Sequence, residues 1–261
     1  MPDRRRPSDH NRSSSRARPG PPRRVAASVS AQSENAELDA LVANLSGIDD
    51  PTLLRTQLAE YLAELRQWNA QGNLVSQSDL GRLVSRHVAE SLAALPWIDR
   101  SNASQVIDIG SGGGFPIVPL KLARPALRVA LVESRRMKSL FLRRLSVKLE
   151  LRSFWVWSMR IESLADLPQP DPEEILEHIA CDEIPDVRPS IDLITARAVA
   201  PLSDLARWSA KLVAPGGRLL AYKGSRLEEE LEAWLKSPAP WMLEELIPVT
   251  PEITIVVLRR E

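Results

Sequence analysis

The spacing of apolar residues divides this 261-residue chain into three parts. Large apolar residues are scarce over residues 1–33, where arginine, serine and proline dominate, so we expect a disordered tail there. Over residues 34–98 apolar residues recur every three or four positions, which predicts a helical N-terminal subdomain. Over residues 99–261 short apolar runs alternate with helical patterns, which is typical of an α/β domain.

Two clear helices are expected in the N-terminal subdomain. Asp50 followed by Pro51 is typical of a helix start, with a capping side chain and a proline in the first turn. The helical spacing continues from there to a loop that we expect over residues 69–78. A second helix is expected to begin at Leu80 and to end at Pro96, because proline cannot continue a helix from its interior.

Five short apolar runs and a final hairpin predict a seven-stranded sheet. The strands are expected at residues 105–109, 128–132, 153–157, 191–195, 218–222, 241–249 and 253–259. Helical patterns separate most of the first five runs, so these strands should be largely parallel. Residues 168–190 hold five prolines and several acidic residues, which predict an inserted surface loop. The expected fold is therefore a doubly wound, mostly parallel α/β sheet with a helical N-terminal subdomain.

The first expected strand ends in a glycine-rich turn. This stretch reads Val106-Ile107-Asp108-Ile109-Gly110-Ser111-Gly112-Gly113-Gly114-Phe115-Pro116. Glycines let a backbone turn tightly and approach a ligand, and open α/β sheets bind ligands at the carboxyl ends of their strands. Gly110, Gly112 and Gly114 follow the spacing G-x-G-x-G, whereas a dinucleotide site has G-x-G-x-x-G and would need glycine where Phe115 stands. With Asp108 before it, the turn resembles motif I of the S-adenosylmethionine (SAM) methyltransferases.

Three further candidates for cofactor binding follow other strands. Glu133 ends the second strand about 20 residues beyond the turn, where a carboxylate can accept hydrogen bonds from ribose hydroxyls. Ile161-Glu162 follow the third strand and Arg197 follows the fourth. Because carboxyl ends of parallel strands meet at one edge of the sheet, these residues and the glycine turn are expected to form one site.

The bulk composition excludes several classes of protein. Cys181 is the only cysteine, which rules out an intrachain disulfide framework and fits a reducing compartment. The three histidines are scattered, so no metal site is expected. No apolar run approaches the roughly 18 residues that span a bilayer, and no apolar segment near the N-terminus indicates a secretory signal. We therefore expect a cytoplasmic protein, and we expect a monomer because nothing in the chain indicates an obligate interface.

The charge is unevenly distributed, although the chain as a whole is neutral. Residues 1–24 hold eight arginines against two aspartates and carry +6, so the remainder carries −6. Such a basic arm can hold RNA through its phosphates, or it can be a dispensable tail or the product of a start codon placed too far upstream.

A second basic segment follows Glu133. It is either a solvated helix face or a cationic patch for RNA phosphates. His87 lies on an apolar helix face, where a satisfied core histidine is the commoner outcome, and Arg86 beside it could reach a phosphate. The residues that we consider for RNA contact are Arg86, His87, Arg136, Lys138, Arg143, Arg160 and Lys223.

Taken in order, these motifs resemble one family, the bacterial 16S rRNA guanine-N7 methyltransferases. The residues that carry the resemblance over roughly 50–260 are Trp68-Asn69, Asn73-Leu74, Arg86-His87, Ser91-Leu92, the glycine turn with Phe115-Pro116, Arg124-Pro125, Phe141-Leu142-Arg143, Arg160, Glu162, Arg197-Ala198-Val199-Ala200-Pro201-Leu202, Pro215-Gly216-Gly217-Arg218 and Lys223-Gly224. The resemblance implies a Rossmann-like fold, SAM as cofactor with contacts at Gly110, Phe115, Ile161-Glu162 and Arg197, and 16S rRNA or a small ribosomal subunit particle as partner. The chain has Glu90 and Glu133 where this family often has aspartate.

The residues also indicate which chemistry is absent. After the fourth strand there is no Asn/Asp-Pro-Pro-aromatic motif of the enzymes that methylate amino groups of DNA, and the cysteine that C5 methylation needs lies in the inserted loop. Guanine N7 has a lone pair and no proton to lose, so alignment of the reactants suffices and no general base is expected. Arg197 could also shape the electrostatics beside the transferred methyl. Two alternatives stay open, a ribosome assembly factor that binds SAM without turnover and a SAM methyltransferase of small molecules.

Overall fold

The computed structural model describes residues 23–166, 191–236 and 240–261, and within them it contains one seven-stranded sheet. The strands are β1 (Gln105–Ile109), β2 (Arg128–Val132), β3 (Phe154–Trp157), β4 (Ile191–Arg197), β5 (Val213–Lys223), β6 (Trp241–Thr250) and β7 (Ile253–Arg260). Their order is β3-β2-β1-β4-β5-β7-β6. The first five strands pair in parallel, whereas β7 pairs antiparallel with both β5 and β6. The predicted mostly parallel seven-stranded fold is confirmed.

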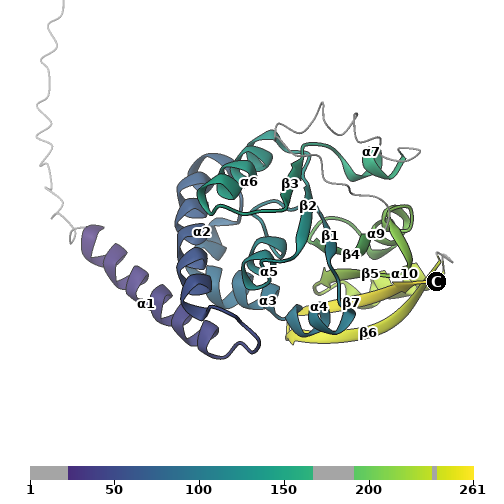
Figure 1. The fold of residues 1–261 in the computed structure, drawn as a ribbon, viewed down its shortest axis with the longest axis horizontal. Helices are drawn as coiled ribbons and strands as arrows, with labels where there is room; N and C mark the ends of the chain where they lie inside the picture. Colours follow the sequence, from purple (N-terminus) through teal and green to yellow (C-terminus); the bar gives the residue numbers. More distant parts are fainter. Residues whose placement is uncertain (1–22, 167–190, 237–239) are drawn as a thin grey trace, which may run out of the picture.

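Helices cover both faces of this sheet (Figure 1). One face packs against α2 (Pro51–Gly72), α3 (Ala89–Leu92), α5 (Ile117–Ala123) and α6 (Arg136–Lys148), and the other against α7 (Ile161–Asp166), α9 (Leu202–Ser209) and α10 (Leu227–Leu235). Side chains alternate between the two layers along each strand, as the pleat requires. Val106 is buried in the first layer and Ile107 in the second, so every central strand is apolar on both sides.

The N-terminal subdomain begins earlier than the sequence predicted. Helix α1 spans Arg23–Ala43, so residues 23–33 are helical and the expected tail boundary is wrong, while residues 1–22 lie outside the described part. Leu38 of α1 is fully buried. Adding residues to a helix that is already anchored costs little, which accounts for its extension into the polar segment. The predicted start of α2 is confirmed, because the Leu53 N–H donates to Asp50 Oδ1 over 2.8 Å.

The single helix predicted from Leu80 is wrong. The chain forms a 3₁₀ helix η1 (Gln77–Arg82), a π-helix η2 (Leu83–Val88), the short α3, and α4 (Leu95–Ser101). Pro96 lies in the first turn of α4, where its missing N–H costs no hydrogen bond, so it starts a helix and does not end one. The expected domain boundary at residue 98 consequently falls inside α4. Wide π turns are frequent at functional sites, and η2 carries Arg86 and His87.

Other differences lie at element ends. Helices α7 and α10 were not predicted, and β5 runs through Pro215-Gly216-Gly217 with a register shift against β4. The predicted hairpin is confirmed. The loop expected at 168–190 lies outside the described residues, as does Cys181. In the part of the chain that the structure describes, no helix is both long and apolar enough to cross a membrane.

Candidate active site

The glycine turn after β1 is set by backbone conformation. Gly110, Gly112 and Gly114 have φ angles of 68°, 55° and 96°, values that residues with a Cβ rarely adopt. A Cβ on Gly114 would lie 2.7 Å from Val118 Cγ2 and 3.1 Å from the Tyr61 hydroxyl. Neighbouring side chains therefore already occupy the space that a side chain at Gly114 would need. Gly110 and Gly112 are half-buried and form the accessible side of the turn.

The carboxylate of Glu133 joins this turn to the start of α6. Its Oε2 accepts a hydrogen bond from the Gly112 N–H over 2.9 Å, and its Oε1 accepts one from the Arg135 N–H over 2.7 Å. A carboxylate offers about four acceptor positions, so two remain for a ligand. Lys138 also lies here, because a Cβ on Gly112 would be 3.7 Å from its Nζ. The structure thus brings together the ends of β1 and β2, as the sequence predicted.

Asp108 is fully buried beneath the turn. Its Oδ1 accepts a hydrogen bond from Thr195 Oγ1 of β4 over 2.6 Å, and its Oδ2 has no hydrogen-bond partner among the described residues. Burial raises the pKa of this carboxyl to about 7, since removal from water disfavours the charged form. Asp108 therefore ties β1 to β4 under the site and does not reach the surface.

Three aromatic rings support the turn. The Tyr61 hydroxyl of α2 donates to the Gly113 carbonyl over 2.6 Å, and the Tyr61 ring lies 5.4 Å from that of Phe115. His87 stacks on the other side of Phe115, with 4.8 Å between ring centroids. Burial, reinforced by the charge of Arg197, lowers the pKa of His87 to about 4, so its ring is neutral near pH 7. The neutral His87 ring is thus partly buried against Phe115, and neither of its nitrogens has a hydrogen-bond partner among the described residues.

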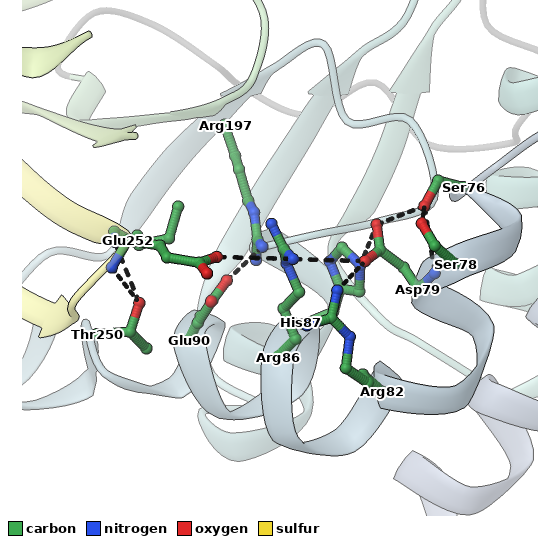
Figure 2. Close-up of polar contacts among 11 residues, drawn as sticks. Ser76, Ser78, Asp79, Arg82, Arg86, His87, Glu90, Arg197, Thr250 and Glu252 are labelled. Atoms are coloured by element: carbon green, nitrogen blue, oxygen red, sulfur yellow. Dashed lines mark hydrogen bonds and ion pairs between the residues drawn. The ribbon is translucent and has the colours of Figure 1, made fainter. Parts of the chain in front are cut away.

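Arg197 ends β4 and turns toward the N-terminal subdomain. Its Nη2 donates to Glu90 Oε2 of α3, and the two side chains are only 10% and 4% exposed. Figure 2 shows the Arg197 side chain reaching across to Glu90, beside Arg86 and His87. The Arg197 Nη1 has no hydrogen-bond partner among the described residues. Burial raises the pKa of Glu90, while the charges of Arg197 and Arg86 oppose that rise.

Asp79 holds a second group of ion pairs next to this one (Figure 2). Its Oδ1 lies 3.3 Å from Arg82 Nη2 and 3.6 Å from Arg86 Nη1. Its Oδ2 lies 3.5 Å from Nε2 of His87, whose neutral ring adds a polar contact and not an ion pair. The Arg86 Nη1 also lies 3.7 Å from Glu252 Oε2 in the turn between β6 and β7. Arg86 therefore links the N-terminal subdomain to the final hairpin.

Several predicted RNA contacts are engaged within the protein. Arg143 donates to the Val156 carbonyl and the Ser158 hydroxyl, and Lys223 Nζ lies 2.6 Å from Glu230 Oε2. Arg144 and Lys148 each lie 2.6 Å from the carboxylate of Glu64, which is 1% exposed on α2. Arg136 and Arg160 are exposed. Two of the basic residues of α6, Arg144 and Lys148, thus pair with α2, while Arg136 stays exposed.

Sequence reasoning missed Tyr61, Glu64 and Glu90 as supports of the site. Glu64 did carry a signal, because it stands on the apolar face of α2 between Tyr61 and Trp68 and should therefore have been expected to have a buried partner. The partner of Glu90 lies 107 positions away, so helical spacing could not reveal it. Among the described residues no cluster of histidine, cysteine, aspartate or glutamate could hold a metal ion.

The packing of Gly114 leads to a stability prediction. Replacing Gly114 with alanine should lower the free energy of unfolding by about 2–3 kcal/mol, because backbone strain and a clash with Val118 add together. Gly216 is a matched control: its φ of 83° is similarly left-handed, but a Cβ there meets nothing within 4 Å. Gly216→Ala should cost about 1 kcal/mol from strain alone. Equal losses in urea denaturation would show that the packing beneath the turn contributes nothing.

Solved structures share this fold. A putative O-methyltransferase from Klebsiella pneumoniae matches with a TM-score of 0.54 and 12% identity over 88% of this chain and 98% of that one. An O-methyltransferase from Bacillus cereus in complex with SAH matches with a TM-score of 0.51 and 14% identity over 88% of this chain and all of that one. The sheet of this chain therefore has the Rossmann-like fold of these methyltransferase structures.

Sequence comparison narrows the class to a family. The family described as GidB, rRNA small subunit methyltransferase G, matches residues 54–246. The ribosomal RNA small subunit methyltransferase G of Roseiflexus sp. (strain RS-1) is 44% identical over 176 residues, 67% of each chain. That of Janthinobacterium sp. (strain Marseille) is 32% identical over 195 residues, 73% of this chain and 77% of the relative. The chain belongs to the rRNA small subunit methyltransferase G family, which confirms the resemblance found in the sequence.

Proposed function

We propose that this protein transfers the methyl group of SAM to N7 of a guanine in 16S rRNA, as free rRNA or in a small ribosomal subunit particle. One observation carries the proposal: a chain of this family places a glycine turn, Glu133 and Arg197 at the carboxyl ends of β1, β2 and β4. We place the reaction in the cytoplasm and take the active form to be a monomer.

The donors and acceptors at the turn fit SAM. The backbone of Gly110 and Gly112 and the remaining acceptor positions of Glu133 suit the methionine part and the ribose hydroxyls. Ile161-Glu162 at the start of α7 and Arg197 on β4 complete the cofactor contacts. Three further residues do not contact the cofactor and instead stabilise the conformation of the turn through their packing and hydrogen bonds. They are Asp108, Gly114 and Phe115.

The chemistry requires alignment more than proton transfer. SAM supplies a methyl group made electrophilic by its sulfonium, and guanine N7 supplies a lone pair without a proton to remove. The protein must hold N7 in line with the methyl group and exclude water, and such positioning is worth up to about 7–11 kcal/mol in favourable cases. We therefore propose a reaction without a general base, in which Asp108 stays buried, His87 stays stacked on Phe115 and Glu133 is assigned to the ribose.

For the RNA we propose contacts at the exposed basic residues. Arg136 and Arg160 lie next to the carboxyl ends of β2 and β3, so they can meet phosphates that flank the target base. Lys138 lies beside the turn and can meet either a phosphate or the cofactor. Arg86, His87, Arg143 and Lys223, which the sequence also offered, would have to leave internal contacts to do so, and we assign them supporting roles.

The test is a methyl-transfer assay with labelled SAM on 16S rRNA and on purified small subunits, followed by mapping of the product. We expect methyl on N7 of one guanine. Gly110→Val should lower the rate by about 100-fold or more, because the side chain would clash with Val199 and crowd the turn. Gly81→Ala, at a glycine with open space, is the control and should keep its rate.

Other outcomes of this assay would contradict the proposal. Methyl on a carbon or on an exocyclic amine would show a different reaction. Transfer to small molecules and not to RNA would favour the small-molecule enzyme. A Gly110→Val protein that loses methylation yet still supports subunit assembly in cells would favour the assembly factor.

A further inference from the structure

The pair formed by Glu90 and Arg197 joins the helical subdomain to the proposed reaction site. Glu90 lies on α3, and Arg197 is the last residue of β4 at the carboxyl edge of the sheet. Their side chains are 4% and 10% exposed, so both charges are removed from water. Burial of a charge is costly unless a partner compensates it, so this pair is held together strongly once formed.

The geometry of the pair fixes the direction of the guanidinium. An arginine side chain presents five N–H donors in a rigid planar fork. The Arg197 Nη2 donates to Glu90 Oε2, while Nη1 has no hydrogen-bond partner among the described residues. Because the fork is rigid, Glu90 determines where the remaining donors of Arg197 point.

The net charge of the Glu90–Arg197 pair also affects the methyl transfer. In the proposed reaction the N7 lone pair forms the N–CH₃ bond as the C–S bond breaks, the bonding electrons leave with sulfur, and no proton moves. Positive charge therefore passes from sulfur to the guanine ring. An unpaired buried guanidinium nearby would oppose that shift, since Coulomb interactions are strong away from water. Paired with Glu90, Arg197 can donate hydrogen bonds while the pair stays neutral overall.

We propose that Glu90 is a positioning residue for methyl transfer: it aims Arg197 at the reacting groups and cancels its charge. This inference rests on the proposed function. Other charged groups that act on Glu90 are Arg86 of η2 and Glu252 of the β6–β7 turn. Glu252 does not replace it, because its side chain is 71% exposed and its carboxylate lies 3.7 Å from Arg86.

Glu90→Gln tests this role, because glutamine keeps the shape and an acceptor oxygen but carries no charge. We expect kcat to fall about tenfold or more, and the affinity for S-adenosylhomocysteine, measured by calorimetry, to fall by a smaller factor, because the glycine turn and Glu133 do not depend on Glu90. The wild-type kcat should decline toward acid as Glu90 takes up a proton, and the kcat of Glu90→Gln should lack that decline. Glu90→Asp should recover most of the activity and the pH dependence.

Glu244→Gln is the control, because Glu244 also pairs with an arginine, Arg218, but lies on β6 far along the chain from the turn. Its kcat should not change. A folded Glu90→Gln protein with kcat within about threefold of wild type would overturn the inference. If Glu90→Gln does not fold, the comparison is made between wild type and Glu90→Asp. In both proteins we then measure the pH at which kcat falls to half of its maximum on the acid side. The same pH in both proteins would overturn the inference. If the wild-type protein does not methylate guanine N7, that result would instead contradict the proposed function.

Discussion

Replacing Arg197 with methionine should lower the free energy of unfolding by about 3–5 kcal/mol at pH 8, the usual cost of stranding one member of a buried ion pair. Methionine preserves much of the apolar stem of arginine, so the lost volume contributes little. What remains is the carboxylate of Glu90, 4% exposed and without its partner. The loss should shrink at pH 5, because burial already raises the pKa of Glu90 and protonation removes the stranded charge.

Two variants show whether the stranded charge causes this loss. Arg197→Met combined with Glu90→Gln should be more stable than Arg197→Met alone, since no charge is then left buried. Arg55→Met removes an arginine from a pair whose partner, Asp39, is 63% exposed, and it should cost less than about 1 kcal/mol. Urea denaturation at pH 5 and pH 8 measures all four proteins. A loss for Arg197→Met no larger than that for Arg55→Met would contradict the interpretation.

The sheet could be predicted because each of its strands leaves a local pattern. Apart from Asp108, the runs at Val106–Ile109 and Val129–Val132 are apolar on both faces, as strands between two helical layers must be. The convergence of Gly112 and Glu133 also followed from sequence, because the carboxyl ends of parallel strands meet by topology. A rule that depends only on strand direction does not require knowledge of side-chain contacts.

The supports of the site could not be predicted in this way. Glu90 and Arg197 are 107 positions apart, and Glu64 meets Lys148 across two helices. Such partners become neighbours only when the subdomain packs onto the sheet. The change of helix type after Arg82 is similar, because the tertiary contact of His87 with Phe115 overrides the local apolar spacing there. Local pattern therefore specifies the elements, and packing specifies what the charged residues do.

Replacing Asp108 with asparagine should stabilise the protein at alkaline pH and much less at pH 5. Asp108 is fully buried, and burial raises its pKa to about 7, whereas in an unfolded chain an aspartate titrates near 3.9. The folded state therefore holds this proton more tightly than the unfolded state. Its contribution is fully present below pH ~4 and is lost as the pH rises through about 7.

The magnitude follows from the difference between these two pKa values. About three units correspond to roughly 4 kcal/mol of stability that the wild type gives up between pH 4 and pH 9. Asparagine can still accept the hydrogen bond from Thr195 Oγ1 but cannot ionise, so Asp108→Asn should not show this decline. The difference in unfolding free energy between the two proteins, measured by urea denaturation without added cofactor, should grow from about pH 4 to about pH 7 and then level off.

Thr195→Val provides the matched variant, because it removes the hydroxyl that hydrogen-bonds Asp108 Oδ1 and favours the ionised carboxylate. Without that donor the pKa of Asp108 should rise further, so the decline in stability should still begin near pH ~4 but continue to a higher pH and become deeper. Combining Thr195→Val with Asp108→Asn should abolish this pH dependence, since no group is left at this position to titrate. If wild type and Asp108→Asn instead lose stability in parallel from pH 5 to pH 9, the ionisation of Asp108 is not what lowers the unfolding free energy of the wild type.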